Sequence, residues 1–412
     1  MRDYAAASHL RDLVLRHVHL IDGVADGVQP DVAVVVRDGR IAGIVEAGRA
    51  PAGAGITVID GAGAYVLPGL WDVHVHFEWP RLPDASIAEL TLQYAANAHE
   101  ALTEAGVTAV RTAGTPHLID VALKRAFDSG RLVGPRIFAG GWFLTTTAGH
   151  ALATGFAKPC DGPEAFVTAI REQIQGGVDH IKLNLTGGII GPAWDRHWHS
   201  FFTDAELQAA FAICRQRSMK VMAHAANAEA VKAALRLGAH SVEHGYVMDD
   251  EALALFRERD AWYVPTLGIT HLTPSQAASP REKRYVEERN LPASVNARAE
   301  AAVGEHRAWF QRALKSGVKM ALGSDLRPLR DAALLEIGLW VKDGATPRQA
   351  LLAATRHAAE LCGAADELGT VEVGKRADLI AVRGNPLDDI EHLADLALVV
   401  KDGVVVADHR TR

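Results

Sequence analysis

Residues 66–76 read Val-Leu-Pro-Gly-Leu-Trp-Asp-Val-His-Val-His. Apolar residues alternate with Asp72, His74 and His76, and a period of two residues is typical of a β-strand. Side chains two residues apart on a strand point to the same side, so we expect His74 and His76 to project together. Two neutral imidazoles side by side can bind one divalent cation. Taken alone, the pair fits two ordinary core or surface histidines equally well. The rest of the sequence must distinguish this interpretation from a pair of metal ligands.

The composition is that of an ordinary globular protein. The chain has 412 residues, 49% hydrophobic and 23% charged, enough for a large core and more than one domain. A net charge of -7 and the lack of a basic run argue against nucleic acid as a partner. Residues 1–20 lack the apolar core of a signal peptide, and no stretch of about 18 apolar residues predicts a membrane span. Three scattered cysteines predict a reducing compartment without a disulfide framework, namely Cys160, Cys214 and Cys362. We therefore expect a cytoplasmic protein with no membrane partner.

Two similar patterns occur near the two ends of the chain. Residues 32–44 place apolar runs on both sides of Asp38-Gly39, and residues 398–407 do the same around Asp402-Gly403. Asp-Gly between apolar runs predicts a two-residue hairpin. We expect the two ends to pack together as a small β-sandwich domain of residues 1–65 and 364–412, with residues 66–363 inserted between them.

Strands and helices alternate within the insert. The predicted strands are 65–76, 109–113, 136–140, 180–185, 221–225, 241–245, 263–267 and 319–325. The predicted helices include 87–105, 163–175, 204–216, 228–237 and 250–259, with a charged helical insertion at 281–316. Thr203 and Glu206 form a plausible capping box at the start of 204–216. Eight strands alternating with helices predict an α/β fold of the (β/α)8 TIM barrel type. The alternative is an open doubly wound sheet, but no Gly-x-Gly-x-x-Gly follows the first strand.

Ionisable side chains gather where the predicted strands end, and in a barrel the catalytic groups lie at the C-terminal ends of the strands. So many buried ionisable groups are improbable in a structural core, because each needs a partner. Imidazole and carboxylate ligands suit two divalent ions, with zinc as the first choice. The set is His74, His76, Lys182, His224, His244 and Asp325.

Lys182 is the unusual member of this set, because an ammonium group repels cations. A lysine in a low-dielectric, metal-rich pocket should have a lowered pKa and become a nucleophilic amine. Such an amine can add carbon dioxide to form a carbamate, whose two oxygens can bridge two metals. The alternative is that Lys182 points outward or pairs with a carboxylate.

The sequence resembles the amidohydrolase superfamily, in the branch of imidazolonepropionase-like and prolidase-like metal-dependent hydrolases. The motifs are Pro-Gly-Leu-Trp-Asp-Val-His-Val-His (68–76), His-Ile-Lys-Leu (180–183), Val-Met-Ala-His-Ala (221–225), Ser-Val-Glu-His-Gly (241–245), Leu-Gly-Ser-Asp (322–325) and Gly-Thr-Val-Glu-Val-Gly-Lys-Arg-Ala-Asp-Leu-Ile (369–380). The resemblance covers nearly the whole chain and implies a barrel with a split β-sandwich.

The resemblance also implies a role for each metal ligand. His74 and His76 would hold the more buried metal together with Asp325. His224 and His244 would hold the second metal, and carboxylated Lys182 would bridge both. Imidazolonepropionase is mononuclear and lacks such a lysine, so Lys182 favours the binuclear, peptidase-like subgroup. A metal-bridging hydroxide would attack the carbonyl while a metal polarises its oxygen, and Asp325 would pass the proton to the leaving nitrogen.

Four further residues are candidates for substrate contact. By resemblance, His150 would stabilise the developing oxyanion or contact the substrate. Tyr246 either donates its phenol to the substrate carbonyl or packs in the core. Trp142 either forms an apolar wall at the pocket mouth or serves packing. Many relatives continue with Gly, Pro and His after the final aspartate, whereas this chain has Leu-Arg-Pro. Arg327 would therefore clamp a substrate carboxylate or cap the following helix.

These features predict a binuclear metal-dependent amidohydrolase. It would cleave the C–N amide bond of a small-molecule N-acyl amino acid, dipeptide or related amide. One alternative is hydrolysis of a cyclic amide, carbamate or lactone on the same metal centre. Another is a catalytically silent metal-binding protein. Because relatives commonly assemble, we also expect a homo-oligomer.

Overall fold

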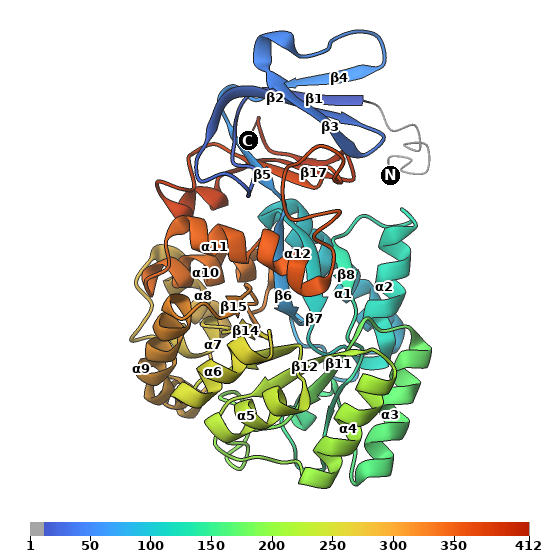
Figure 1. Ribbon diagram of the computed structural model, residues 1–412, viewed down its shortest axis with the longest axis vertical. Helices are drawn as coiled ribbons and strands as arrows, with labels where there is room; N and C mark the ends of the chain where they lie inside the picture. Colours follow the sequence, from blue (N-terminus) through green and yellow to red (C-terminus); the bar gives the residue numbers. More distant parts are fainter. Residues whose placement is uncertain (1–11, 412) are drawn as a thin grey trace.

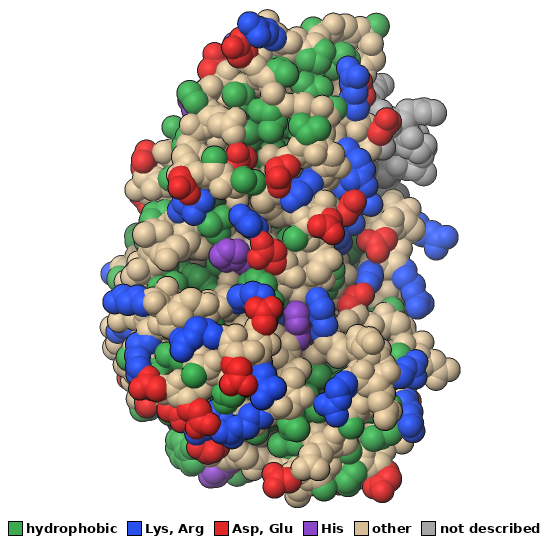
Figure 2. Space-filling model, viewed as in Figure 1, with side chains coloured by type: hydrophobic (Ala, Val, Ile, Leu, Met, Phe, Trp, Pro, Cys, Tyr) green, Lys and Arg blue, Asp and Glu red, His purple; other side chains and the backbone are tan. Residues whose placement is uncertain are grey.

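A sheet built from both ends of the chain lies against an α/β body built from its middle (Figure 1). The computed structural model describes residues 12–411, so the first eleven residues of the predicted N-terminal segment lie outside the described residues. Acidic and basic side chains are interspersed over the face drawn in Figure 2. Within the described residues, no helix has the length and apolar character needed to cross a bilayer.

The sheet of the chain ends has eight strands in the order β18-β17-β16-β5-β1-β2-β3, with β4 paired to β1. Both predicted hairpins are present, and Asp38-Gly39 and Asp402-Gly403 have the positive φ angles that such turns require. β5 joins the two ends, because it pairs with β1 on one side and β16 on the other. The strands are β1 (Asp12–Leu20), β2 (Gln29–Arg37), β3 (Arg40–Glu46), β4 (Ile56–Asp60), β5 (Tyr65–Pro68), β16 (Leu379–Val382), β17 (Leu396–Lys401) and β18 (Val404–Asp408).

The middle of the chain contains two parallel sheets. One has the order β6-β7-β8 and the other β10-β9-β11-β12-β13-β14-β15. The sequence predicts a single closed barrel, whereas the paired strands are short and leave two separate sheets. The strands are β6 (Leu70–Val75), β7 (Val107–Thr112), β8 (Arg136–Phe138), β9 (Phe143–Thr145), β10 (Ala157–Pro159), β11 (His180–Asn184), β12 (Lys220–Ala225), β13 (Ser241–His244), β14 (Trp262–Val264) and β15 (Lys319–Met320).

The helices follow these strands along the chain and lie outside them (Figure 1). The predicted capping box is present: Thr203 Oγ1 accepts the Glu206 N–H, and Glu206 accepts the Thr203 N–H. The helices are α1 (Ile87–Ala105), α2 (Ile119–Asp128), α3 (Pro163–Gly176), α4 (Asp204–Gln216), α5 (Ala228–Leu237), α6 (Asp250–Glu258), α7 (Gly268–His271), α8 (Pro280–Arg289), α9 (Ala293–Lys315), α10 (Leu329–Lys342), α11 (Pro347–Ala353) and α12 (Arg356–Cys362).

Two predicted elements are divided in the structure. The helical insertion 281–316 is two helices, α8 and α9, because Asn290 adopts a left-handed cap and Pro292 follows it. The predicted strand 65–76 is two strands in different sheets, β5 and β6. Gly69 lies at the break, where its N–H donates to the carbonyl of Asp378. A Cβ there would lie 2.2 Å from the Thr108 side chain, so only glycine fits this crossing.

Candidate active site

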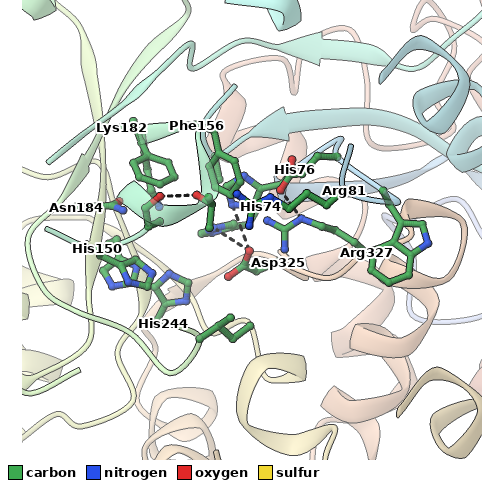
Figure 3. Close-up of a pocket in the computed structure, with 18 residues that line it drawn as sticks. His74, His76, Arg81, His150, Phe156, Lys182, Asn184, His244, Asp325 and Arg327 are labelled. Atoms are coloured by element: carbon green, nitrogen blue, oxygen red, sulfur yellow. Dashed lines mark hydrogen bonds and ion pairs between the residues drawn. The ribbon is translucent and has the colours of Figure 1, made fainter. Parts of the chain in front are cut away.

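The six predicted metal ligands line one cavity of about 210 Å³ (Figure 3). Four strands, β6, β11, β12 and β13, supply them together with the residue directly after β6 and the segment after β15. Parallel strands place these ends on one side of the body, which is why residues distant in sequence meet. They are His74, His76, Lys182, His224, His244 and Asp325.

Three of these side chains are spaced to hold one cation. The Nε2 atoms of His74 and His76 lie 3.9 Å and 3.3 Å from Oδ1 of Asp325. One ligand atom from each of the three residues falls within 4.8 Å of the others. His74 Nδ1 faces Glu243 Oε2 at 2.8 Å, and His76 Nδ1 lies 3.2 Å from the carbonyl oxygen of Gly114. These acceptors hold the Nδ1–H of each ring, which leaves both Nε2 lone pairs for a metal.

In His224 and His244, too, one ring nitrogen donates a hydrogen bond and the other is free for a metal. In His224 the donor is Nε2 instead of Nδ1. His224 Nε2 donates to the carbonyl oxygen of Gly187 at 3.0 Å, so its Nδ1 is the free nitrogen. His244 Nδ1 donates to Thr266 Oγ1 at 2.7 Å, which leaves Nε2 free. Burial is the main cause that lowers the pKa of His224 and His244 well below the usual range. Burial likewise lowers the pKa of His74 to about 4. The neutral rings are therefore suited to bind a metal ion.

Lys182 points into the cavity rather than outward. Its side chain is buried, and Nζ has neither a hydrogen-bond partner nor an ion pair among residues 12–411. Burial lowers the pKa of the Lys182 amine to about 8, so the neutral form is more accessible than in an exposed lysine. An unpartnered buried amine is costly. The amine is therefore placed where a modification or a ligand would satisfy it, and the residues present fit a metal centre.

Asp325 and His244 adopt left-handed backbone conformations, with φ of 55° and 76°. Such conformations are strained for residues other than glycine and cluster at active sites. The Asp325 N–H donates to the carbonyl of His74 at 2.8 Å, which ties the segment after β15 to β6. Burial opposes ionisation of Asp325, but His74 and His76 lower the pKa of the carboxyl well below its usual range.

Asp72 belongs to the same alternating stretch as the two histidines but does not line the cavity. Its carboxylate accepts the N–H groups of His74 and Ser324 at 3.1 Å and 2.9 Å. Burial raises the pKa of Asp72 to about 7. Asp72 therefore holds the backbone of two neighbouring segments in place.

His150 lies in the loop after β9 and lines the cavity beside His224. The two rings stack with centroids 4.6 Å apart and planes at 30°. His150 Nδ1 is 2.7 Å from Asp195 Oδ2. His150 is thus at the place where a substrate would meet the predicted metal ligands.

Tyr246 and Trp142, predicted as catalytic or substrate-binding residues, do not line the cavity. Gly245, with a φ of 52°, turns the chain after His244, and the Tyr246 ring is buried beside that histidine. Gln173 on α3 bonds the backbone N–H and carbonyl of Trp142, and this fixes the tryptophan outside the cavity. In both cases the backbone direction after the strand decides the position.

Arg327 lines the cavity, as predicted for a substrate contact, but its partner was not foreseen. Its Nε lies 2.6 Å from Glu78 Oε1, and its guanidinium lies 5.7 Å from the Phe156 ring centre. Glu78 is two residues beyond His76, so the same alternation could have placed it on this side of the strand. Phe156 carries no comparable signal in the sequence. Arg81 and Asn184 also line the cavity.

The chain is similar to known proteins in sequence and in fold. Residues 65–406 match the amidohydrolase family. Ochratoxinase from Aspergillus niger is 30% identical over 359 residues, covering 79% of this chain and 72% of that protein. A solved Xaa-Pro dipeptidase with methionine bound in its active site has a TM-score of 0.82 at 30% identity, covering 96% of this chain and 99% of the other.

A solved prolidase complexed with N-methylphosphonate-L-proline is also similar, with a TM-score of 0.84 at 27% identity, and covers 97% of this chain and 100% of the other. The family match spans most of the chain, and the two solved relatives have a similar fold over 96% and 97% of it. The chain therefore belongs to the amidohydrolase family, is of the prolidase-like type, and is a hydrolase that acts on carbon–nitrogen bonds.

Proposed function

We propose that this hydrolase uses a binuclear metal centre to cleave the amide bond of an N-acyl amino acid, dipeptide or related amide. One observation carries the proposal. Candidate ligands from four strands and the segment after β15 surround one cavity, and the unpartnered Lys182 amine lies among them. A single metal would need only His74, His76 and Asp325. The remaining two imidazoles and the lysine support a second metal position.

The histidine nitrogens without a hydrogen bond indicate which residues would hold each metal ion. His74, His76 and Asp325 would hold one ion, and His224 and His244 the other. The neutral Lys182 amine would attack carbon dioxide, form an N–C bond and lose a proton, giving a carbamate with two oxygens for the two ions. Bound there, zinc or another divalent ion supplies a Lewis acid that polarises a carbonyl and acidifies water.

Asp325 would move the proton. Its carboxylate is ionised at neutral pH because His74 and His76 lower its pKa. It would accept a proton from the attacking water and deliver it to the leaving nitrogen as the C–N bond breaks. His150, beside the ligands, would contact the substrate.

The cavity walls support a substrate with an apolar acyl group and a free carboxylate. Phe143, Phe156 and Ile190 form apolar surface. Arg327 places a guanidinium at the same cavity, and this group matches a carboxylate in shape and charge. The ligands of the two solved relatives, methionine and an L-proline derivative, are amino acids or amino-acid derivatives.

We also propose that the two parallel sheets form one (β/α)8 barrel spanning residues 66–363, with the chain ends as a separate β-sandwich domain. Three backbone hydrogen bonds bridge the gaps between the sheets. The Val73 N–H donates to Leu322 O and the Asp325 N–H to His74 O, and the Asp179 N–H donates to Ala139 O just beyond β8. Residues 66–68, at the start of the proposed barrel range, lie in β5, and this strand pairs within the sheet of the chain ends.

The test is metal content per chain, measured by plasma mass spectrometry on wild type and Lys182→Ala. Lys158→Ala serves as the control, because Lys158 forms a surface ion pair with Glu172. We expect about two metals in wild type and in the control, and fewer in Lys182→Ala. About one metal in every protein would refute the bridge.

The same preparations are then assayed with N-acyl amino acids, dipeptides, cyclic amides, lactones and carbamates. Release of amino acids from the first two classes supports the proposed substrate. Turnover confined to ring substrates or carbamates would overturn it in favour of the alternative chemistry on the same centre.

A further inference from the structure

A buried carboxylate in the loop between β11 and α4 is paired with His150. Asp195 Oδ2 lies 2.7 Å from His150 Nδ1, and Asp195 Oδ1 accepts the N–H of Gly188 at 3.0 Å. The Asp195 side chain has no exposed surface. Both of its oxygens act as acceptors, so the proton between Asp195 and the ring belongs to His150 Nδ1.

This contact determines which edge of the imidazole is available. His150 keeps 14% of its side-chain surface exposed and lines the cavity, stacked on His224. The ring makes its hydrogen bond to Asp195 through Nδ1. Figure 3 shows the His150 ring on the same side of the cavity as Asn184 and His244. Nε2 is therefore the nitrogen of His150 that can meet a substrate.

The loop that carries Asp195 is built around this pair. A Cβ on Gly188 would lie 2.4 Å from His150 Cε1, and a Cβ on Gly191 would lie 2.4 Å from Asp195 Oδ2. Glycine at these two positions lets the backbone close around the ring and the carboxylate. From α9, Arg298 donates to three carbonyls of the loop, including that of Asp195 at 3.2 Å. Arg298 thus fixes the backbone of the loop that carries the carboxylate.

We propose that Asp195 is a positioning residue for the amide hydrolysis: it holds the His150 ring with its proton on Nδ1, so that the Nε2 lone pair faces the substrate. The inference rests on the proposed function. An Nε2 atom without a proton accepts a hydrogen bond, and the N–H of the scissile amide is the donor that the substrate offers. An acceptor already in place stabilises the positive charge that develops on the leaving nitrogen as this atom gains its proton.

Asparagine cannot reproduce this arrangement, although it has the same shape. Its amide offers one acceptor and one donor. Either the Gly188 N–H or the His150 Nδ1–H would then face an NH2 group. Asp195→Asn therefore disturbs the orientation of His150 with little change in volume.

The experiment is a double-mutant cycle in the metal-loaded enzyme with an N-acyl amino acid as substrate. We expect His150→Gln to lower kcat about 10²–10³-fold and Asp195→Asn to lower it about 10–100-fold, as loss of a supporting partner does. KM and metal content should change little. The double variant should be no slower than His150→Gln alone, because Asp195 acts through that ring. Arg298→Gln, which loosens the loop but leaves the pair, should retain most of kcat.

Other outcomes overturn the inference. Additive losses in the double variant, or an Arg298→Gln defect equal to that of Asp195→Asn, would mean that Asp195 only builds the loop. Should Asp195→Asn not fold, Asp195→Glu replaces it, and an unchanged kcat there refutes the inference. Wild-type enzyme that hydrolyses no amide would refute the proposed function itself, which is a distinguishable result.

A second readout does not depend on turnover. In 15N–1H imidazole spectra of the zinc-loaded protein, His150 should show a protonated Nδ1 in wild type. That signal should shift or disappear in Asp195→Asn and persist in Arg298→Gln. An unchanged His150 signal in Asp195→Asn would refute the positioning role.

Discussion

Nδ1 of His74 lies 2.8 Å from Oε2 of Glu243, and both side chains are buried. On its other oxygen, Glu243 accepts from the Arg111 guanidinium at 2.9 Å. Burial alone would raise the pKa of Glu243, but Arg111 and His74 lower it to about 2. The ionised carboxylate therefore fixes the His74 tautomer that a metal requires.

Glu243→Gln should weaken both the fold and the metal site. The substitution leaves the Arg111 charge buried without its counterion, which costs about 3–5 kcal/mol. Metal affinity should fall about 10–100-fold, because His74 loses its orienting acceptor. Urea unfolding of the metal-free protein and metal titration measure the two effects. The control is Glu243→Gln combined with Arg111→Met, which removes both charges and should recover part of the stability; if it recovers none, the charge argument is wrong.

Asp325→Asn should separate metal binding from proton transfer. The amide oxygen can still act as a ligand, but it cannot accept the proton of the attacking water. We expect the metals to be retained and kcat to fall about 10²–10⁴-fold. Plasma mass spectrometry and a turnover assay check the two parts. Asp331→Asn, on α10 beside Arg330, is the matched control and should be fully active. Full activity of Asp325→Asn would remove Asp325 from the chemistry.

Arg327→Met should discriminate between charged and neutral substrates. Loss of a charge-assisted contact to a carboxylate raises KM about tenfold or more for an N-acyl amino acid. The KM of the corresponding carboxamide should change little, because it carries no charge to pair with Arg327. An equal change in the KM of both substrates would show that Arg327 serves only to hold Glu78.

Gly69→Ala should destabilise the junction between the two parts of the chain. The new Cβ would lie 2.2 Å from the Thr108 side chain, and relieving this overlap costs about 1–3 kcal/mol. Gly43→Ala in β3 is the control, since no atom lies within 4 Å of its Cβ. That control should be neutral or stabilised by about 0.4–1 kcal/mol. Thermal unfolding of the two variants compares them directly, and equal midpoints would contradict the expected strain.

Stability at low pH should depend on Asp343, far from the cavity. Burial opposes its ionisation, but His271 and Arg307 lower the pKa of Asp343 below its ordinary value of 3.8. A carboxyl with a lowered folded-state pKa stabilises the protein above the unfolded pKa, and this contribution is lost as the pH falls through the folded value. The unfolding free energy should therefore decrease below pH 3.8. Asp343→Asn should have a smaller slope there in urea titrations, and an identical slope would exclude this contribution.

Local periodicity in the sequence was sufficient to predict the parallel strands and the residues at their ends. Alternation gives the side of a strand on which a residue lies, and parallel strands bring their ends together. For this reason His74, His76 and four partners could be predicted to meet, and in the structure they line one cavity. The Asp-Gly turns were predictable for a similar reason, since a two-residue hairpin depends on its own two residues.

Tertiary structure alone decided what lies around those ligands. Gly69 divides the predicted strand because β5 and β6 pair with different sheets. Tyr246 does not line the cavity, whereas Asp195 reaches His150 from a loop 45 residues later. These outcomes depend on where loops leave the strands and which segments pack against them. Periodicity within one element carries no information on such contacts, because they are set by packing between elements distant in sequence.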